Sequence, residues 1–243
     1  MIVNTTLNYS PNFDLKKRKK KEIKFIVYHY TGMKTEKEAI KKLTDPKSKV
    51  SSNYYIKNSG EILTLVPDLY TSWHAGISNW KKFSLINYKS IGIEISNPGH
   101  EYNYKKFSKK QILSIIKLSK FLIRKYKIKP NFILGHSDIA PDRKKDPGEK
   151  FPWQYLAKKK IGYWHNLKTQ YLIKLRNKTI NQKDKKIFIK NLIKIGYSKN
   201  FYKNKNSVNL TKAFQRRFRQ KLINGIIDKE CLIISKNLTK RIK

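Results

Sequence analysis

Two of the five histidines stand where a metal ligand could be held. His29 and His136 each end a short apolar run, IVYHY and FILGHSD, whose β-branched and aromatic residues predict buried strands. Side chains at the carboxyl ends of strands in an α/β sheet face the crevice where ligands bind. Asp146 follows His136 in the loop DRKKDPG, next to Pro147. Two imidazoles and one carboxylate would leave a tetrahedral zinc ion one open position, as catalytic zinc requires. Hydrogen-bonded surface histidines would give the same pattern.

An acid interrupts a further apolar run, SIGIEIS, at Glu94. A carboxylate on a buried strand is expensive unless it is paired, hydrogen-bonded or close to a metal. Glu94 is therefore either a general acid or base directed into the crevice or a solvated residue on an edge strand. The spacing of residues leaves both interpretations open.

Three more residues lie in segments that could reach the same crevice. Lys144 precedes Asp146 by two residues, although a lysine in so lysine-rich a chain is more often a solvated surface group. The segment WHAG places Trp73 and His74 beside a flexible glycine. These two residues suit either a wall of a substrate groove or a structural corner.

The elements that must position these side chains alternate between strands and helices. Helical periodicity with Ser108 as N-cap predicts a long helix, and Thr35 with Glu38 predicts a capping box on a shorter one. The turn residues of NSG between two strand-like runs predict a hairpin. Together they predict an α/β fold with a mixed central sheet flanked by helices. The predicted strands are residues 23–30, 53–66 as a hairpin, 90–96 and 131–139, and the predicted helices are 35–43 and 108–127.

The strand pattern ends after Trp164, and the remaining sequence predicts short amphipathic helices over residues 184–197, 207–222 and 228–243. We therefore expect a small C-terminal domain of three helices. The expected organisation is a tail or loop over 1–22, a sheet-bearing domain over 23–166, a linker over 167–180 and the helical domain over 181–243.

Composition excludes several classes of protein. Hydrophobic residues make up 39% of the 243 residues, which supplies a core and excludes a disordered chain. The single cysteine, Cys231, excludes an intrachain disulfide and a cysteine-based zinc site. No apolar run is long enough to span a membrane. The N-terminus lacks the pattern of a secretory signal, which favours the cytoplasm, with the periplasm or envelope as the alternative.

The net charge of +40 invites a nucleic-acid hypothesis, but the type of cation argues against it. Lysine dominates, together with Ile and Asn, as compositional drift toward A/T-rich codons would produce. A specific nucleic-acid reader more often uses arginine. We expect no specific nucleic-acid partner, although the charge could attract acidic polymers, including those of cell walls.

Five blocks, in this order, carry a resemblance to a known family: IVYHYTGM, LVPDLYTSWHAGIS, SIGIEISNPGH, FILGHSDIAPDRKKDPGEKFPW and IGYW. They resemble the zinc-dependent N-acetylmuramoyl-L-alanine amidases of the type-2 amidase family, which includes phage amidase lysozymes and peptidoglycan recognition proteins. The resemblance covers roughly residues 8–165. The segment AFQRRFRQKLINGIID, residues 213–228, resembles a three-helix peptidoglycan-binding module.

The resemblance implies a role for each matching residue. His29, His136 and Asp146 match the three Zn²⁺ ligands, Glu94 the catalytic glutamate, and Lys144 the lysine that stabilises the oxyanion. The family's WHAG block near the substrate groove corresponds to Trp73 and His74. Asn53 departs from the histidine of many relatives, and we expect it to contact substrate.

The implied reaction is hydrolysis of the amide between the lactyl group of N-acetylmuramic acid and L-alanine. The expected substrates are anhydro-muropeptide fragments and, given the C-terminal module, intact peptidoglycan as well. The expected assembly is a monomer. The alternative is a non-catalytic peptidoglycan-binding protein on the same fold, which typically lacks a metal ligand.

Overall fold

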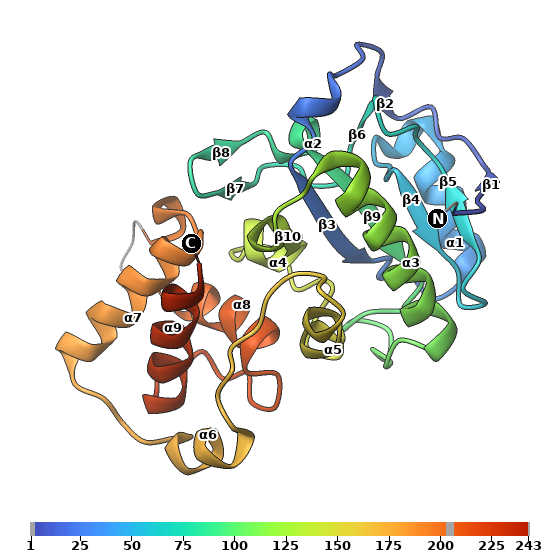
Figure 1. Ribbon diagram of the computed structural model, residues 1–243. Coiled ribbons are helices and arrows are strands. Elements are labelled where there is room, and N and C mark those ends of the chain that lie inside the picture. Colours follow the sequence, from blue (N-terminus) through green and yellow to red (C-terminus); the bar gives the residue numbers. More distant parts are fainter. Residues whose placement is uncertain (1–2, 203–206, 243) are drawn as a thin grey trace.

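The computed structural model describes residues 3–202 and 207–242, arranged around one six-stranded sheet (Figure 1). The two long strands β3 and β9 pair in parallel at its centre, and β4 and β10 flank them, also in parallel. The hairpin partner β5 runs antiparallel to β4. The spatial order is β1 (Thr6–Leu7), β5 (Ile62–Thr64), β4 (Tyr54–Ile56), β9 (Ser90–Ile95), β3 (Phe25–Tyr30) and β10 (Ile133–Gly135).

The predicted strands and caps are largely confirmed. Strands occur within each predicted segment, and the class is α/β with a mixed sheet. Thr35 caps α1 (Glu36–Thr44) through the predicted box with Glu38, and Ser108 caps α3 (Lys109–Tyr126) as predicted, with a further box to Gln111 that was not predicted. The last strand differs from the prediction because β10 ends at Gly135 and the helix α4 (His136–Ile139) begins at once. His136 therefore lies on the first turn of a helix.

The two faces of the sheet pack against different parts of the chain. Side chains alternate along a strand, so Ile26 and Tyr28 point to one face while Phe25 and Val27 point to the other. The first face packs against α3, and α5 (Trp153–Lys158) adds Trp153 and Leu156 to the same core. His29 continues the alternation of Phe25 and Val27, so it belongs to the second face.

The second face shares its core with the C-terminal helices. Phe25, Val27 and Leu134 belong to one hydrophobic cluster with Phe188 and Phe214, which come from two helices of the C-terminal segment. Figure 1 shows these helices grouped beside the β10 and α4 end of the sheet. The helices are α6 (Thr169–Leu175), α7 (Gln182–Ile195), α8 (Val208–Phe218) and α9 (Lys229–Arg241).

The C-terminal segment contains the predicted helices and one more. The helices α8 and α9 lie within their predicted segments, whose residue 243 falls outside the described residues, and α7 begins two residues before its predicted segment, at Gln182. In the stretch expected to be a linker, the chain forms α6, whose Leu172 is buried in the shared core. The division of the chain into separate domains stays a prediction.

The N-terminal segment differs from the expected tail. Strand β1 extends the sheet by pairing with β5, and β2 (Phe13–Asp14) pairs with β6 (Thr71–Ser72). Arg18 is 2% exposed and donates to the carbonyl oxygens of Asp68, Asn87 and Tyr88. Backbone pairing and this buried guanidinium order a segment that its polar composition had predicted to be loose.

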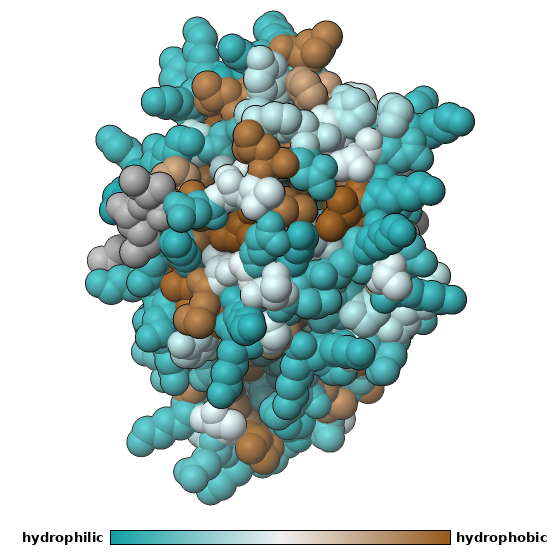
Figure 2. Space-filling model, turned by 90° about the vertical axis from the view of Figure 1, so that its right-hand side faces the viewer, coloured by the Kyte–Doolittle hydropathy of each residue, from teal (hydrophilic) through white to brown (hydrophobic). Residues whose placement is uncertain are grey.

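The remaining short elements connect these layers, and one side of the molecule has a mainly polar surface. Figure 2 shows the side of β1 and α1, where hydrophilic side chains cover most of the surface and hydrophobic ones are interspersed. Among the described residues, none of the helices is long and apolar enough to cross a membrane. The short elements are β7 (Asn79–Trp80), β8 (Phe83–Ser84), α2 (Ile86–Lys89) and the 3₁₀ turns Lys20–Glu22, Pro46–Ser48, Pro130–Phe132 and Lys199–Tyr202.

Candidate metal centre and active site

The three residues predicted as metal ligands meet at one point. His29 comes from the carboxyl end of β3, His136 from the start of α4 directly after β10, and Asp146 from the following loop. The Nδ1 atoms of His29 and His136 are 3.0 Å apart. Asp146 Oδ2 lies 2.9 Å from His29 Nδ1 and 3.1 Å from His136 Nδ1. Parallel pairing of β3 with β10 brings the two strand ends together.

The donor set fits a zinc ion. Burial, and then the neighbouring His136, lower the pKa of His29 to about 4, so at neutral pH this imidazole is unprotonated, the form that binds metal. Burial alone would raise the pKa of Asp146, but the imidazoles of His136 and His29 hold it below its usual range. One carboxylate oxygen and two imidazole nitrogens within about 3 Å of one another form a donor set of the kind that catalytic zinc sites use.

Hydrogen bonds on the far side of each ring orient the two histidines. His29 Nε2 lies 3.0 Å from His74 Nδ1, and His74 Nε2 lies 3.0 Å from Ser90 Oγ. His136 Nε2 lies 3.1 Å from the carbonyl oxygen of Ala75. A ring whose Nδ1 faces the metal carries its proton on Nε2, so both histidines donate outward. Such outer partners fix the tautomer and the orientation of a metal-binding imidazole.

The sequence around these outer partners explains their geometry. A Cβ on Gly92 would lie 2.5 Å from His74 Cγ, so the glycine within β9 lets the imidazole lie against the strand. Asn87 Oδ1 accepts from the backbone nitrogens of His74 and Ala75, at 3.1 and 2.6 Å. The WHAG segment is thereby held so that His74 and the Ala75 carbonyl face the two histidines.

Glu94 lies beside His29 on the neighbouring strand. The two residues are direct partners in the register of β3 and β9, so their side chains leave the same face of the sheet. Burial, and then the charge of Asp146, raise the pKa of Glu94 well above its usual value. Its Oε2 atom is buried and has no hydrogen-bond partner among the described residues. A buried acceptor without a protein partner is costly and calls for an explanation, and a role at a reacting group or a metal is one such explanation.

A cleft of about 170 Å³ opens onto these groups. Lys144 and Trp73 line it, as the sequence predicted for residues close to substrate. The indole nitrogen of Trp73 donates to Asp14 Oδ1 at 2.8 Å, which ties the N-terminal segment to the rim. The other lining residues are His29, Tyr30, Thr31, Met33, Ala39, Lys42, Leu43, Val50, Ser51, His74, Glu94, His136 and Asp146.

One predicted substrate contact requires correction, and a second, at His74, stays a prediction. Asn53 is fully buried and its amide is used by the protein itself, donating to Val66 O and accepting from Gly92 N and Ser72 Oγ. It stabilises the junction of β4 and β9 and does not line the cleft. His74 borders the cleft, but both its ring nitrogens are engaged with His29 and Ser90. Its contacts are those of a residue that orients His29.

Sequence reasoning missed Ser90 and Asn87, which support His74. Neither residue has a recognisable motif, because each acts through a contact between distant segments. The glycine in SIGIE was the available signal, since glycine inside a strand often marks a close approach by another group.

The comparisons with known proteins agree with this geometry. The N-acetylmuramoyl-L-alanine amidase family matches residues 19–149. The amidase AmiD of Escherichia coli K12 is 34% identical over 232 residues, covering 90% of this chain and 83% of AmiD. The 1,6-anhydro-N-acetylmuramyl-L-alanine amidase AmpD of Haemophilus influenzae is 32% identical, covering 61% of this chain and 88% of AmpD.

Solved structures extend the match to the C-terminal helices. The complex of E. coli AmiD with anhydro-N-acetylmuramic acid-L-Ala-D-γ-Glu-L-Lys has a TM-score of 0.80, and 91% of this chain and 90% of that chain are covered. AmpDh3 of Pseudomonas aeruginosa in complex with anhydromuramic pentapeptide is 27% identical, with a TM-score of 0.79 and coverage of 97% and 98%.

Fold and site together define a hydrolase of amide bonds in peptidoglycan. The chain belongs to the N-acetylmuramoyl-L-alanine amidase family. Its activity is cleavage of the amide that joins the muramoyl group to L-alanine.

Proposed function

We propose that the chain is a zinc-dependent amidase that acts on anhydro-muropeptides, the fragments released during turnover of the cell wall. His29, His136 and Asp146 hold the zinc ion, Glu94 transfers protons, and Lys144 stabilises negative charge. The observation that carries the proposal is the meeting of three metal-binding atoms within about 3 Å, next to Glu94, whose buried Oε2 atom has no hydrogen-bond partner among the described residues.

Each ligand is held in the form that binds a metal. The backbone nitrogen of Ser137 donates to the carbonyl oxygen of Asp146 at 2.8 Å, which fixes the aspartate against α4. His74 and the Ala75 carbonyl orient the two rings from behind. Zinc, when bound at this point, activates water as a nucleophile and polarises the scissile carbonyl as a Lewis acid.

Glu94 is the group positioned to move protons. Its carboxylate accepts the proton of the attacking water and delivers it to the amine that leaves, as a general base and then a general acid. A raised pKa suits this double task, because a carboxyl group with a pKa nearer to neutral both accepts and releases a proton readily. The parallel register supports this role, because it puts the Glu94 side chain on the same face of the sheet as His29, a proposed zinc ligand.

Lys144 supplies positive charge at the lining of the cleft. It lies in the loop that carries Asp146, and its backbone nitrogen bonds to Ala140 O at 3.0 Å. Its ammonium group stabilises the charge that develops on the scissile carbonyl oxygen, a term that often dominates catalysis. The exposed part of Trp73 forms a wall for the sugar or the peptide.

The similarity to AmiD and AmpDh3 supports fragments as the substrate class, since both were solved with anhydro-muramyl peptides. The test is mass spectrometry of products after zinc-loaded protein is incubated separately with anhydro-muramyl tripeptide and with purified sacculi. We expect free tripeptide from the fragment. Release from sacculi alone would contradict the assignment to fragments, and release from neither would favour the non-catalytic peptidoglycan-binding alternative.

A further inference from the structure

An arginine of the C-terminal helices reaches the strand and turn that carry His136. Arg217 of α8 is 1% exposed, and its Nη2 donates to the carbonyl oxygen of Ile133, the first residue of β10, at 2.8 Å. Its Nη1 forms an ion pair with Asp138 Oδ2 in α4. The guanidinium thus bridges both ends of the six-residue stretch from Ile133 to Asp138, which contains His136.

Asp138 receives a further contact from the C-terminal helices. Tyr197, directly after α7, donates its hydroxyl to Asp138 Oδ1 at 2.8 Å. Asp138 Oδ2 also accepts from the backbone nitrogen of Gly135 at 2.8 Å, which closes the turn around His136. Arg217, Asp138 and Tyr197, named here the Arg217 clamp, therefore connect two C-terminal helices with the turn of a metal ligand.

The same turn also positions the third ligand. Ser137, between His136 and Asp138, donates its backbone nitrogen to Asp146 O at 2.8 Å. The stretch after Asp146 is held by Gln220, whose Nε2 donates to Phe151 O at 2.7 Å. Displacing α4 would consequently move His136 and Asp146 together.

Stability is a poor explanation for so buried an ion pair. Replacing a buried pair by apolar residues is often neutral or stabilising, because desolvation offsets the attraction. Arg217 Nε is moreover buried with no partner among the described residues. The guanidinium is held over Trp153, with Cζ 4.3 Å from the ring centroid, which fixes its direction. A guanidinium held in one direction can fix the geometry of the turn that carries His136.

We infer that Arg217 is a positioning residue for the metal centre and that the C-terminal helices are part of the active-site scaffold. This rests on the zinc site of the proposed function. It assigns to these helices a role in metal binding and turnover, beyond any attachment to peptidoglycan.

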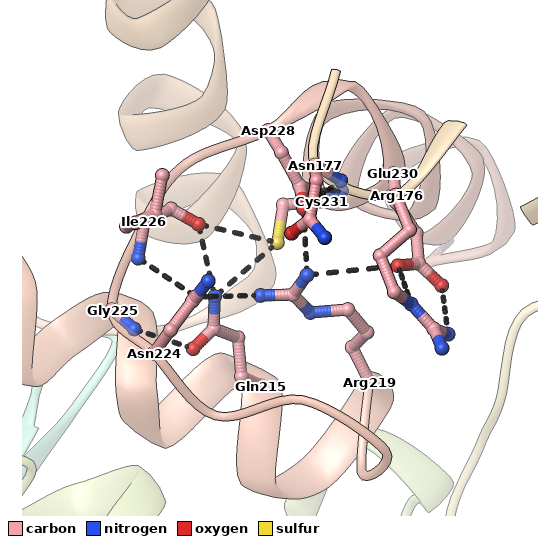
Figure 3. Close-up of polar contacts among 10 residues, drawn as sticks. All are labelled: Arg176, Asn177, Gln215, Arg219, Asn224, Gly225, Ile226, Asp228, Glu230 and Cys231. Carbon is pink, nitrogen blue, oxygen red and sulfur yellow. Dashed lines mark hydrogen bonds and ion pairs between the residues drawn. The ribbon is translucent and has the colours of Figure 1, made fainter. Parts of the chain in front are cut away.

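The test compares Arg217→Met with a matched variant in the same helical segment, Arg219→Met. Figure 3 shows that Arg219 also lies in a buried polar network, where it pairs with Asp228 at 2.6 Å and Asn224 at 3.0 Å. These partners all belong to the C-terminal segment, so loss of the Arg219 guanidinium perturbs the C-terminal helices without removing a contact to α4. Zinc affinity is measured by chelator competition, with the visible absorption of the cobalt-loaded protein and the thermal midpoint alongside.

We expect Arg217→Met to weaken zinc binding by about 10- to 100-fold, the effect of losing an outer-shell partner, and to change the cobalt spectrum. Arg219→Met should lower the thermal midpoint and keep zinc affinity within about twofold of the unaltered protein. Equal zinc affinities in the two variants would overturn the inference. An unaltered protein that binds zinc without cleaving muropeptides would contradict only the proposed function.

A milder pair of variants covers the case in which Arg217→Met fails to fold. Tyr197→Phe removes one hydroxyl from the clamp, whereas Tyr163→Phe removes a nearby hydroxyl that has no partner among the described residues. We expect zinc affinity to fall about twofold to tenfold in the first variant, in line with one hydrogen bond, and to be unchanged in the second. The same affinity in both would refute the clamp.

Discussion

The contact between Gly92 and His74 allows a single added methyl group to test whether His74 orients the proposed metal ligand His29. In Gly92→Ala the new Cβ would lie 2.5 Å from His74 Cγ, about 1 Å closer than two carbon atoms pack. The backbone of Gly92 does not have a positive φ, so alanine is compatible with the strand itself. The imidazole must therefore retreat by about 1 Å, because β9 is fixed between β3 and β4.

A retreat of this size breaks the contact that orients His29. The distance from His74 Nδ1 to His29 Nε2 is 3.0 Å, and about 4 Å is beyond the range of a hydrogen bond. Loss of such a partner weakens metal binding or activity by about 10- to 100-fold. This corresponds to about 1.4–2.7 kcal/mol, since each factor of ten is about 1.4 kcal/mol.

The assay is a double-mutant cycle with His74→Ala, measured by zinc affinity and by kcat/KM on anhydro-muramyl tripeptide. If the methyl group acts through His74, Gly92→Ala has a large effect in the unaltered protein and little further effect once His74 is absent. Unchanged zinc affinity in Gly92→Ala, or an equal loss in both backgrounds, would refute the reasoning.

Three further predictions concern the acid–base group, the cation and pH. Glu94→Gln should lower kcat by about 10²- to 10³-fold, because the isosteric amide cannot accept a proton, and the variant should still bind zinc. A kcat near that of the unaltered protein would remove Glu94 from the mechanism. Lys144→Met should lower kcat by about 10²- to 10³-fold through loss of charge stabilisation, measured on the same substrate, with unchanged turnover as the contrary result. Burial lowers the pKa of His165 to about 4, so between pH 6.5 and 4 the unfolded chain binds more protons than the folded chain. About 3 kcal/mol of the free energy of unfolding that is present above pH 6.5 should therefore be lost as the pH falls to 4. Urea unfolding of His165→Gln should show a smaller loss over this pH range.

Local patterns predicted the elements that carry the site. The apolar runs ending at His29 and His136 became parallel neighbours, and the capping box at Thr35 and the N-cap at Ser108 formed as expected. These features depend on residues close in sequence. The register that places Glu94 beside His29 joins strands far apart in the chain, so spacing alone left its role open.

Residues that act through distant contacts were not predictable in the same way. Arg217 lies in the pattern AFQRRFRQ, where a charged residue is expected to face solvent, yet it is buried against α4. Arg18 lies in a basic run that predicted a loose tail, yet its guanidinium binds three carbonyl groups. In a chain with 56 cations, composition could not distinguish these two from the solvated majority.

Asn53 shows the opposite error, because a contact with substrate was predicted for a residue that is buried in the fold. Its position in the resemblance to the amidases suggested a contact with substrate, but the amide closes hydrogen bonds at the junction of β4 and β9. A polar side chain that is fully used by backbone groups has no capacity left for a ligand.

The central claim is that zinc held by His29, His136 and Asp146 drives cleavage of the muramoyl–L-alanine bond. The most direct measurement follows the release of tripeptide from anhydro-muramyl tripeptide, together with zinc content, in the unaltered protein and in His29→Ala. We predict one zinc per chain in the unaltered protein, with activity lost on chelation and restored by zinc, and neither tight zinc binding nor release in the variant. Stoichiometric zinc and undiminished release in His29→Ala would contradict the ligand assignment.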